Sequence, residues 1–252
     1  MDYKDFSEET WSFITQKIDE AVKGPGPHFA AFDADGTLWD NDAGNAFFDY
    51  EIDNKLIPLP PEPWKYVYAI KDKNPRDAFL WLAQIHKGLP ITTVRQWAQD
   101  AFIARDGIAV FPPIKKLIEY LKSKNVNVYV VTASVKWAVE PCVAQLGIPF
   151  ENVLGVQTKI ENGLVTDIQD GPITYREGKS EALMQKTNGI RPILSCGNTM
   201  GDYWLLDIAT HIPLAVRTES HEAAFKDKDI MNQELKLYHE AISRKWLTHN
   251  FL

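Results

Sequence analysis

The strongest limit on the fold of this chain comes from one stretch near its start, an apolar run that ends in two aspartates. Residues 28–32 read His-Phe-Ala-Ala-Phe, and Asp-Ala-Asp-Gly-Thr follows at 33–37. The run has the length of a strand, and the Gly-Pro-Gly-Pro segment before it excludes a helix. Gly36 lets the backbone turn away sharply. We therefore predict a strand with Asp33 and Asp35 at its carboxyl end, where open parallel sheets bind ligands.

The two aspartates indicate the chemistry of this strand end. Residues two apart in a strand point to the same side, so Asp33 and Asp35 begin on one face. Carboxylates this close repel each other unless a cation lies between them, and oxygen ligands suit Mg²⁺. They also suit a nucleophile beside an acid/base. A calcium loop is excluded because Leu38 and Gly44 stand where it needs glycine and glutamate. A plain strand-to-turn junction with solvated aspartates stays open.

Composition narrows the class of protein. The 252 residues, 45% of them hydrophobic, suffice for one large domain or one domain with an insertion. A net charge of −7 without a basic stripe argues against a nucleic-acid partner. No apolar run is long enough for a membrane span, and the polar segment 1–5 is unlike a signal peptide. Cys142 and Cys196 lack metal-ligand spacing. We expect a cytoplasmic protein with no membrane partner; the sequence indicates no oligomeric state.

The order of strands and helices predicts an α/β fold with a Rossmann-like parallel sheet. A lead-in helix over 7–22 begins at Ser7, and Ser134 is the expected cap of a later helix. Asn162-Gly163 predicts the turn of a hairpin over 155–168. The other predicted core elements, in chain order, are helix 114–123, strand 126–132, helix 135–146, helix 176–186, strand 190–196, helix 204–209 and strand 213–216. A tail helix would dock through a stripe of Leu235, Tyr238, Ile242 and Trp246.

The segment between the first two core strands reads as a helical cap. It shows no strand alternation, and it contains a proline-rich linker at 58–63. Its helical patches are 46–52, 77–84 and 92–103. We predict a cap domain over residues 42–106 and a core domain over 1–41 and 107–252.

Several features with potential chemistry fall at predicted strand ends or helix starts. They are the pair Asp33 and Asp35, Thr132, Lys179 and the loop 197–202. Each alone is weak, but their joint occurrence in this order resembles the four motifs of the haloacid dehalogenase superfamily of phosphotransferases. The resemblance covers residues 29–37 and 110–216. The hairpin, the approach to Lys179 and the helical insertion are similar to the phosphoserine-phosphatase-like branch.

The resemblance implies a Mg²⁺-dependent phosphatase acting on a small phosphate ester. Asp33 would attack phosphorus and form an aspartyl-phosphate, while Asp35 would protonate the leaving alcohol and then activate water. Thr132 would hold phosphoryl oxygens, and Lys179, preferred over Lys159, would balance their charge. The implied substrate-binding residues are Gly36, Thr37, Ala133, Ser134, Asp42 and Asn198.

The same resemblance implies how the metal would be held. Asp33 would supply its carboxylate and Asp35 its backbone carbonyl. The fourth motif of the family starts with Gly-Asp, whereas this chain has Gly197-Asn198, with Asp202 at the second acidic position. Whether Asn198 or Asp202 contacts the ion directly stays open.

The cap is expected to select the substrate. Its aromatic residues either pack the cap or attract an ammonium group. Asp42 falls where the resemblance places an acidic partner for a substrate amine, so phosphoserine, phosphoethanolamine and phosphocholine are candidates. A sugar phosphate, a mutase reaction and a non-catalytic binding role are the alternatives.

Overall fold

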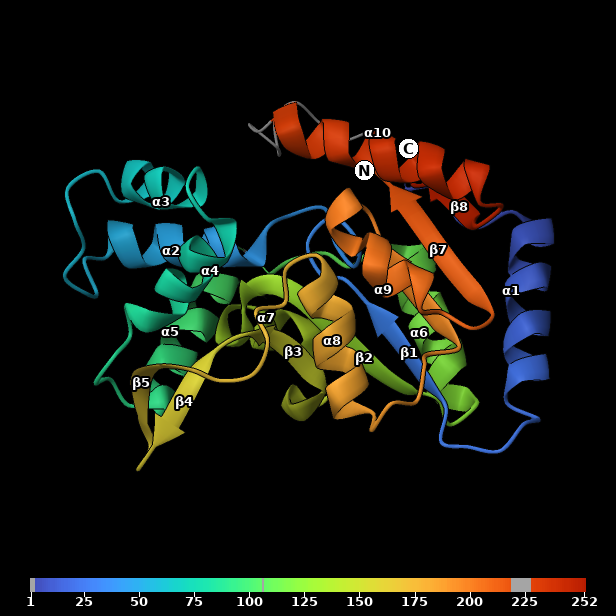
Figure 1. The fold of residues 1–252 in the computed structure, drawn as a ribbon, viewed down its shortest axis with the longest axis horizontal. Coiled ribbons are helices and arrows are strands. Elements are labelled where there is room, and N and C mark those ends of the chain that lie inside the picture. The colour runs from blue at the N-terminus through green and yellow to red at the C-terminus, as the bar shows by residue number, and fades with distance from the viewer. Residues whose placement is uncertain (1–2, 106, 219–227) are drawn as a thin grey trace.

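A six-stranded sheet forms the centre of the molecule. The computed structural model describes residues 3–105, 107–218 and 228–252, with no side-chain description for 228 and 229 (Figure 1). The strand order is β3-β2-β1-β6-β7-β8, and every neighbouring pair is parallel. The strands are β1 Phe29–Phe32, β2 Asn127–Val135, β3 Val153–Val156, β6 Leu194–Gly197, β7 Ile212–Arg217 and β8 Leu247–Asn250. The predicted α/β class with a parallel sheet is confirmed.

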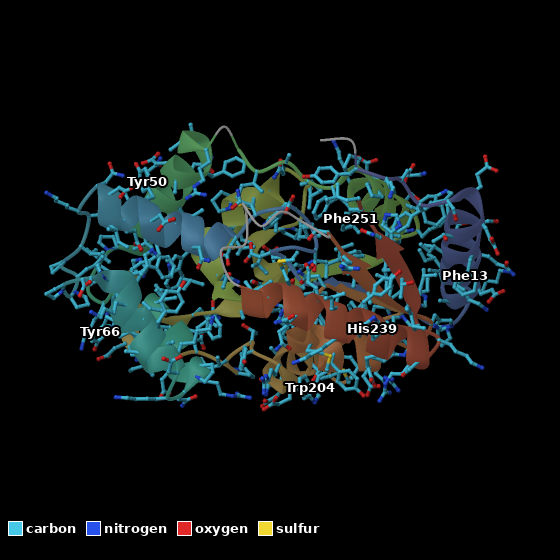
Figure 2. The ribbon with its side chains drawn as sticks, turned by 90° about the horizontal axis from the view of Figure 1, so that it is seen from above. Phe13, Tyr50, Tyr66, Trp204, His239 and Phe251 are labelled. Atoms are coloured by element: carbon cyan, nitrogen blue, oxygen red, sulfur yellow. The ribbon has the colours of Figure 1, made fainter. Side chains whose placement is uncertain are left out.

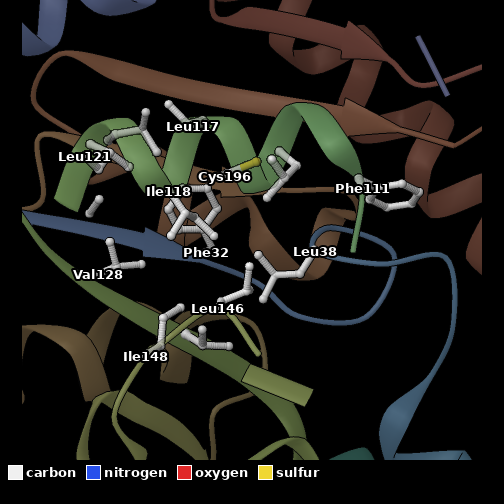
Figure 3. Packing of buried hydrophobic residues seen from close by; sticks show 14 of the residues in the cluster. Phe32, Leu38, Phe111, Leu117, Ile118, Leu121, Val128, Leu146, Ile148 and Cys196 are labelled. Carbon is white, nitrogen blue, oxygen red and sulfur yellow. The ribbon is translucent and has the colours of Figure 1, made fainter. Parts of the chain in front are cut away.

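Helices cover both faces of this sheet, and the alternation of β1 shows why. Ala30 and Phe32 face the main core, which the helix α6 (Pro112–Ser123) fills with Leu117 and Ile118 (Figure 3). Phe29 and Ala31 point to the opposite face, toward the helices α8 (Glu177–Lys186) and α9 (Tyr203–Asp207). The first face carries α1 Glu8–Ala21, α6 Pro112–Ser123 and α7 Lys136–Ala144. The second carries α8 Glu177–Lys186, α9 Tyr203–Asp207 and α10 Lys228–Ser243.

The inserted helices gather at one end of the molecule, opposite α1 (Figure 1). They are α2 Ala43–Asp53, α3 Pro63–Lys71, α4 Pro75–Gln84 and α5 Ile91–Ala104. An antiparallel hairpin of β4 Thr158–Glu161 and β5 Leu164–Gln169 joins them. The backbone N–H of Gly88 donates to Val165 O at 2.8 Å, and that of Ile91 donates to Gly163 O at 3.0 Å. Residues 1, 2 and 106, at the ends of the predicted domain ranges, lie outside the described residues.

Three sequence predictions about these elements were wrong. The hairpin does not start at residue 155, because residues 153–156 form β3 of the main sheet. Ser134 does not cap α7, because β2 continues to Val135. The stripe of α10 is also displaced, since Ile242 is 56% exposed while Leu237 and Ala241 are fully buried.

Other elements were not predicted. The helix α3 begins at Pro63, the last residue of the proline-rich linker, which occupies the first position of the helix. The edge strand β8 consists of half-buried residues with a mixed polar pattern, so its sequence carries little strand signal. Phe150–Asn152 and Met200–Asp202 form short 3-10 helices.

An ion pair ties the inserted helices to the core and gives a testable prediction. Arg95 of α5 donates to both carboxylate oxygens of Glu140 on α7, at 2.7 and 2.9 Å, and Glu140 is buried. In Arg95→Met the buried carboxylate loses its partner, which should cost about 2–3 kcal/mol after allowance for the exposure of Arg95. Urea denaturation measures this loss. The double variant Arg95→Met/Glu140→Gln should recover most of it, and equal stabilities for the single and double variants would contradict the prediction.

Candidate active site

The site lies at the carboxyl ends of three neighbouring strands, β2, β1 and β6. Asp33 follows β1, Thr132 belongs to β2, and Asn198 follows β6. The backbone N–H of Asp33 donates to Cys196 O at 2.9 Å, which fixes the end of β1 against β6. Gly36 has φ +78°, and a Cβ there would collide with the amide nitrogen of Asn198. The turn therefore requires glycine both for its conformation and for the space beside Asn198.

A buried lysine holds two carboxylates together. Lys179 Nζ, in the first turn of α8, lies 2.6 Å from Asp33 Oδ1 and 2.5 Å from Asp202 Oδ1. All three side chains are almost inaccessible to solvent. The two carboxylates raise the pKa of Lys179 even though burial opposes this. Burial, with the charge of Asp202 next, raises the pKa of Asp33 to about 7, and Lys179 opposes the rise. One cation between two carboxylates leaves this cluster with an excess negative charge.

Asp35 has a different set of neighbours. Its Oδ1 accepts from Trp39 Nε1 at 2.9 Å and from the backbone N–H of Ala43 at 2.8 Å, and its Oδ2 accepts from Ser134 Oγ at 2.7 Å. Burial, followed by the charge of Asp42, raises its pKa to about 7, and the donors from Ala43, Ser134 and Trp39 oppose the rise. Among the described residues, the side chain of Asp35 thus accepts only from neutral donors, whereas that of Asp33 contacts the cationic Lys179.

The hydroxyl of Thr37 lies between the carboxylate of Asp33 and the amide of Asn198. Thr37 Oγ1 lies 3.0 Å from Asp33 Oδ2 and 3.2 Å from Asn198 Oδ1. Its one hydroxyl hydrogen can serve only one of these two oxygens at a time. Asn198 Nδ2 donates to Glu234 Oε1 on α10 at 2.8 Å. Burial raises the pKa of Glu234, and the donors Asn198 and Thr218 oppose this.

Both oxygens of Asp202 are occupied by protein donors. Oδ1 takes the ammonium of Lys179, and Oδ2 accepts from the backbone N–H of Asn198 and of Thr199 at 3.1 and 3.0 Å. The hydroxyl of Thr199 adds a contact at 3.2 Å. Asp202 therefore stabilises the loop after β6 through hydrogen bonds within the loop, and it holds the ammonium group of Lys179 in place.

The remaining predicted residues lie around this centre. Thr132 is buried, its Oγ1 accepts from the backbone N–H of Ser134 at 3.1 Å, and its carbonyl accepts from Thr174 Oγ1 at 2.5 Å. Ala133 lies between Thr132 and Ser134 and is partly exposed. Asp42 caps α2 through Asn45 N at 2.7 Å. Lys159, the lower-ranked lysine, is exposed on β4.

The aromatic residues of the inserted helices mainly pack against one another. Trp64 and Trp81 contact the buried ring of Phe48 at 4.9 and 6.1 Å between centroids. Tyr66 is 44% exposed and lies toward the end of the molecule opposite Phe13 of α1 (Figure 2). The arginines of the inserted segment are paired with acidic side chains: Arg76 with Glu177, Arg95 with Glu140, and Arg105, directly after α5, with Asp49.

The comparison with known families decides the affiliation of the chain. The sequence model of the haloacid dehalogenase-like hydrolases matches residues 30–207, which is more than half of the chain. The protein belongs to this family. The resemblance seen in the four motifs is thereby confirmed at the level of the family. A search of curated proteins gives no match.

Solved structures share the fold of this haloacid dehalogenase-like hydrolase at low identity. A protein of unknown function from Anaerococcus prevotii DSM 20548 has a TM-score of 0.72 and 14% identity, covering 98% of this chain and 95% of its own. A protein of unknown function from Bordetella pertussis Tohama I has a TM-score of 0.67 and 17% identity, and the match covers 89% of this chain and 99% of that protein. A substrate-bound phosphoserine phosphatase has a TM-score of 0.50 and 18% identity, and the match covers 88% of this chain and 99% of that protein. These likenesses concern the fold alone.

The donor set of this hydrolase fits a hard divalent cation with few protein ligands. Within the described ranges, no group of three or more His, Cys, Asp or Glu side chains could hold a metal ion. Mg²⁺ does not need such a group, because it keeps several waters and binds through one or two carboxylates plus substrate oxygens. The oxygens of Asp33 and Asn198 that share the Thr37 hydroxyl are suited to it, since one of them always lacks that hydrogen.

Two contacts made with the candidate site residues could not be predicted from the sequence. Glu234 enters the site from α10, beyond the matched residues 30–207, and no motif marks it. Trp39 donates to Asp35, although in the sequence it looks like an ordinary core residue.

Of the helices in the described ranges, none combines the length and the apolar character that a bilayer crossing requires.

Proposed function

We propose that this hydrolase cleaves small phosphate monoesters in a Mg²⁺-dependent reaction that proceeds through an aspartyl-phosphate on Asp33. The observation that carries the proposal is the buried Asp33 carboxylate held by Lys179 and Thr37, two residues before a second carboxylate with a raised pKa. Such a pair supplies a nucleophile and an acid/base at one strand end. Membership of a hydrolase family and the fold of phosphoserine phosphatase support the reaction class.

The two carboxylates would act in sequence. A carboxylate oxygen of Asp33 attacks phosphorus, the bond from phosphorus to the ester oxygen breaks, and protonated Asp35 gives its proton to the leaving alcohol. Asp35 then takes a proton from water, whose oxygen attacks phosphorus and breaks the bond to Asp33. Inorganic phosphate leaves and both carboxylates return to their initial state. A pKa of about 7 lets Asp35 be both donor and acceptor near neutrality.

Other residues would bind the transferring phosphoryl group and the cation. Thr132 and the backbone N–H groups near Ala133 and Ser134 would donate to phosphoryl oxygens, and Lys179 would balance their charge. Asp33, the carbonyl of Asp35 and Asn198 would hold Mg²⁺, which when bound neutralises charge on the phosphoryl oxygens. We assign the ligand role to Asn198 and not Asp202, because protein donors occupy both oxygens of Asp202, whereas the single hydrogen of the Thr37 hydroxyl leaves either Asp33 Oδ2 or Asn198 Oδ1 without it.

The substrate proposed is a small metabolite, with amine-bearing esters first. Asp42 caps the start of α2, and its charge raises the pKa of Asp35, so we place its carboxylate near a leaving group that Asp35 would protonate. The three cap arginines that could meet a substrate carboxylate are already paired. Within this class, these contacts favour phosphoethanolamine and phosphocholine over phosphoserine.

A panel of phosphate esters tests the function. Phosphate release is measured with phosphoserine, phosphoethanolamine, phosphocholine and several sugar phosphates, first with Mg²⁺ and then with EDTA. We expect Mg²⁺-dependent release that is highest for the amine-bearing esters and is lost in EDTA. Equal rates on all esters would refute the amine preference. No release from any ester by folded, Mg²⁺-supplied protein would refute the phosphatase, and transfer of the phosphoryl group to a second metabolite would indicate a mutase.

A further inference from the structure

The amide of Asn198 is held on both sides by buried groups. Its Nδ2 donates to Glu234 Oε1 at 2.8 Å, and its Oδ1 faces Thr37 Oγ1 at 3.2 Å. Asn198 and Glu234 are 2% and 3% exposed, so water does not compete for these contacts. Glu234 lies 36 residues further along the chain, on a helix outside the part that matches the family. Side chains that are far apart in sequence thus meet at the loop after β6.

The contact with Glu234 determines which end of the amide faces Asp33. A carboxylate only accepts hydrogen bonds, so it selects the NH₂ end of Asn198. The reversed amide would place its oxygen against the carboxylate of Glu234. The carbonyl oxygen is therefore directed toward Thr37 and Asp33, where the proposed function places the cation.

The same contact affects the charge of the site. Asn198 stands where the family motif has an aspartate, so one negative charge is missing from the loop. The carboxylate of Glu234 lies directly behind the amide, in a buried environment where charges are weakly screened. Groups behind a metal ligand orient it and increase its basicity. Arg217 and Asp40 are the other charged groups that act on Glu234.

We propose that Glu234 is a positioning residue for the cation site, fixing the Asn198 carbonyl oxygen toward Asp33 and supplying from α10 the negative charge that Asn198 lacks. The inference rests on the proposed function, since it concerns the Mg²⁺ of that reaction. A merely structural role, in which Glu234 only attaches α10 to the loop, would affect stability but not the affinity for the ion.

The test exchanges the two side chains. In Glu234→Gln the new amide can pair with Asn198 in either orientation, so the direction of the carbonyl is no longer fixed. In Asn198→Asp two buried carboxylates face each other. The double variant Asn198→Asp/Glu234→Gln moves the charge into the loop and restores a donor–acceptor pair. Glu240→Gln, at a half-buried position of the same helix where the carboxylate pairs with Arg244 and not with the site, is the matched control.

Binding is measured without substrate, by Mn²⁺ titration followed by electron paramagnetic resonance and by Mg²⁺ competition, with urea denaturation of the metal-free proteins. We expect Glu234→Gln to weaken ion binding by about tenfold or more, the control to bind normally, and the double variant to regain wild-type affinity. Asn198→Asp alone should be the least stable of the set, and the double variant should be more stable than it.

Several outcomes would overturn the inference. Unchanged ion affinity in Glu234→Gln would leave only the structural role, as would a double variant that binds no better than Glu234→Gln. Wild-type protein that binds neither ion would overturn both this inference and the Mg²⁺ dependence of the proposed function. Normal binding without hydrolysis of any ester would overturn the proposed function alone.

Discussion

Asp33→Asn is expected to reduce phosphate release by at least about three orders of magnitude, because it removes the attacking oxygen and not an accessory contact. The amide has nearly the same shape, and its oxygen can still accept from Lys179. The substitution also neutralises the excess negative charge of the buried cluster. The free energy of unfolding at neutral pH should therefore equal that of the wild type or exceed it, so the loss of turnover cannot be ascribed to unfolding.

The measurement combines steady-state kinetics with urea denaturation of the same samples. Asp53→Asn, at an exposed position on α2, is a matched control that should keep full turnover. Mass spectrometry of wild-type protein quenched in acid during turnover should show a phosphate adduct that Asp33→Asn lacks. Substantial turnover by Asp33→Asn would remove Asp33 from the role of nucleophile.

Lys179→Met should have the largest effect on stability. It leaves Asp33 and Asp202 buried without the cation that each contacts. Breaking a buried ion pair by removing one partner costs about 3–5 kcal/mol, because the remaining charge stays desolvated. Turnover should also fall to background, since no ammonium would then balance the phosphoryl oxygens. Urea denaturation and the phosphate-release assay measure the two effects separately.

A second substitution distinguishes the loss of charge balance from the loss of packing. Lys179→Met/Asp202→Asn removes one charge of each sign and should recover a large part of the lost stability, but no turnover. Lys186→Met, on the exposed end of the same helix, is the control and should unfold with the wild-type free energy. A double variant no more stable than Lys179→Met would show that packing and not charge is responsible.

The sheet and the residues at its strand ends could be predicted because they depend on local sequence. The apolar run before Asp33 and the glycine after Asp35 show a strand and a turn without reference to the rest of the chain. Parallel strands then bring Asp33, Thr132 and Asn198 to one edge by topology alone. The affiliation with the hydrolases follows from the same motifs.

Contacts that depend on the packing of distant elements could not be predicted. Glu234 looks like any acidic residue of an amphipathic helix until α10 is placed against the loop after β6. The predicted apolar stripe of α10 is wrong because the helix ends at Ser243, so Trp246 packs on the core from beyond the helix and does not share a helical face with the exposed Ile242. Serine is a residue type that often caps helices, yet the hydroxyl of Ser134 donates its hydrogen bond to Asp35. In each case the deciding partner is far away in the sequence.

The central position of β1 has a consequence for how the protein folds. This early strand pairs with β2 and β6, both of which come much later in the chain, and the salt bridge from Lys179 to Asp33 joins residues 146 positions apart. Contacts of such long range lower folding rates, because the chain loses loop entropy before they form. During synthesis, β1 is made well before β2 and β6, the strands with which it pairs. A nascent chain that ends before β6 therefore lacks Asn198 and Asp202, so it cannot assemble the complete candidate site.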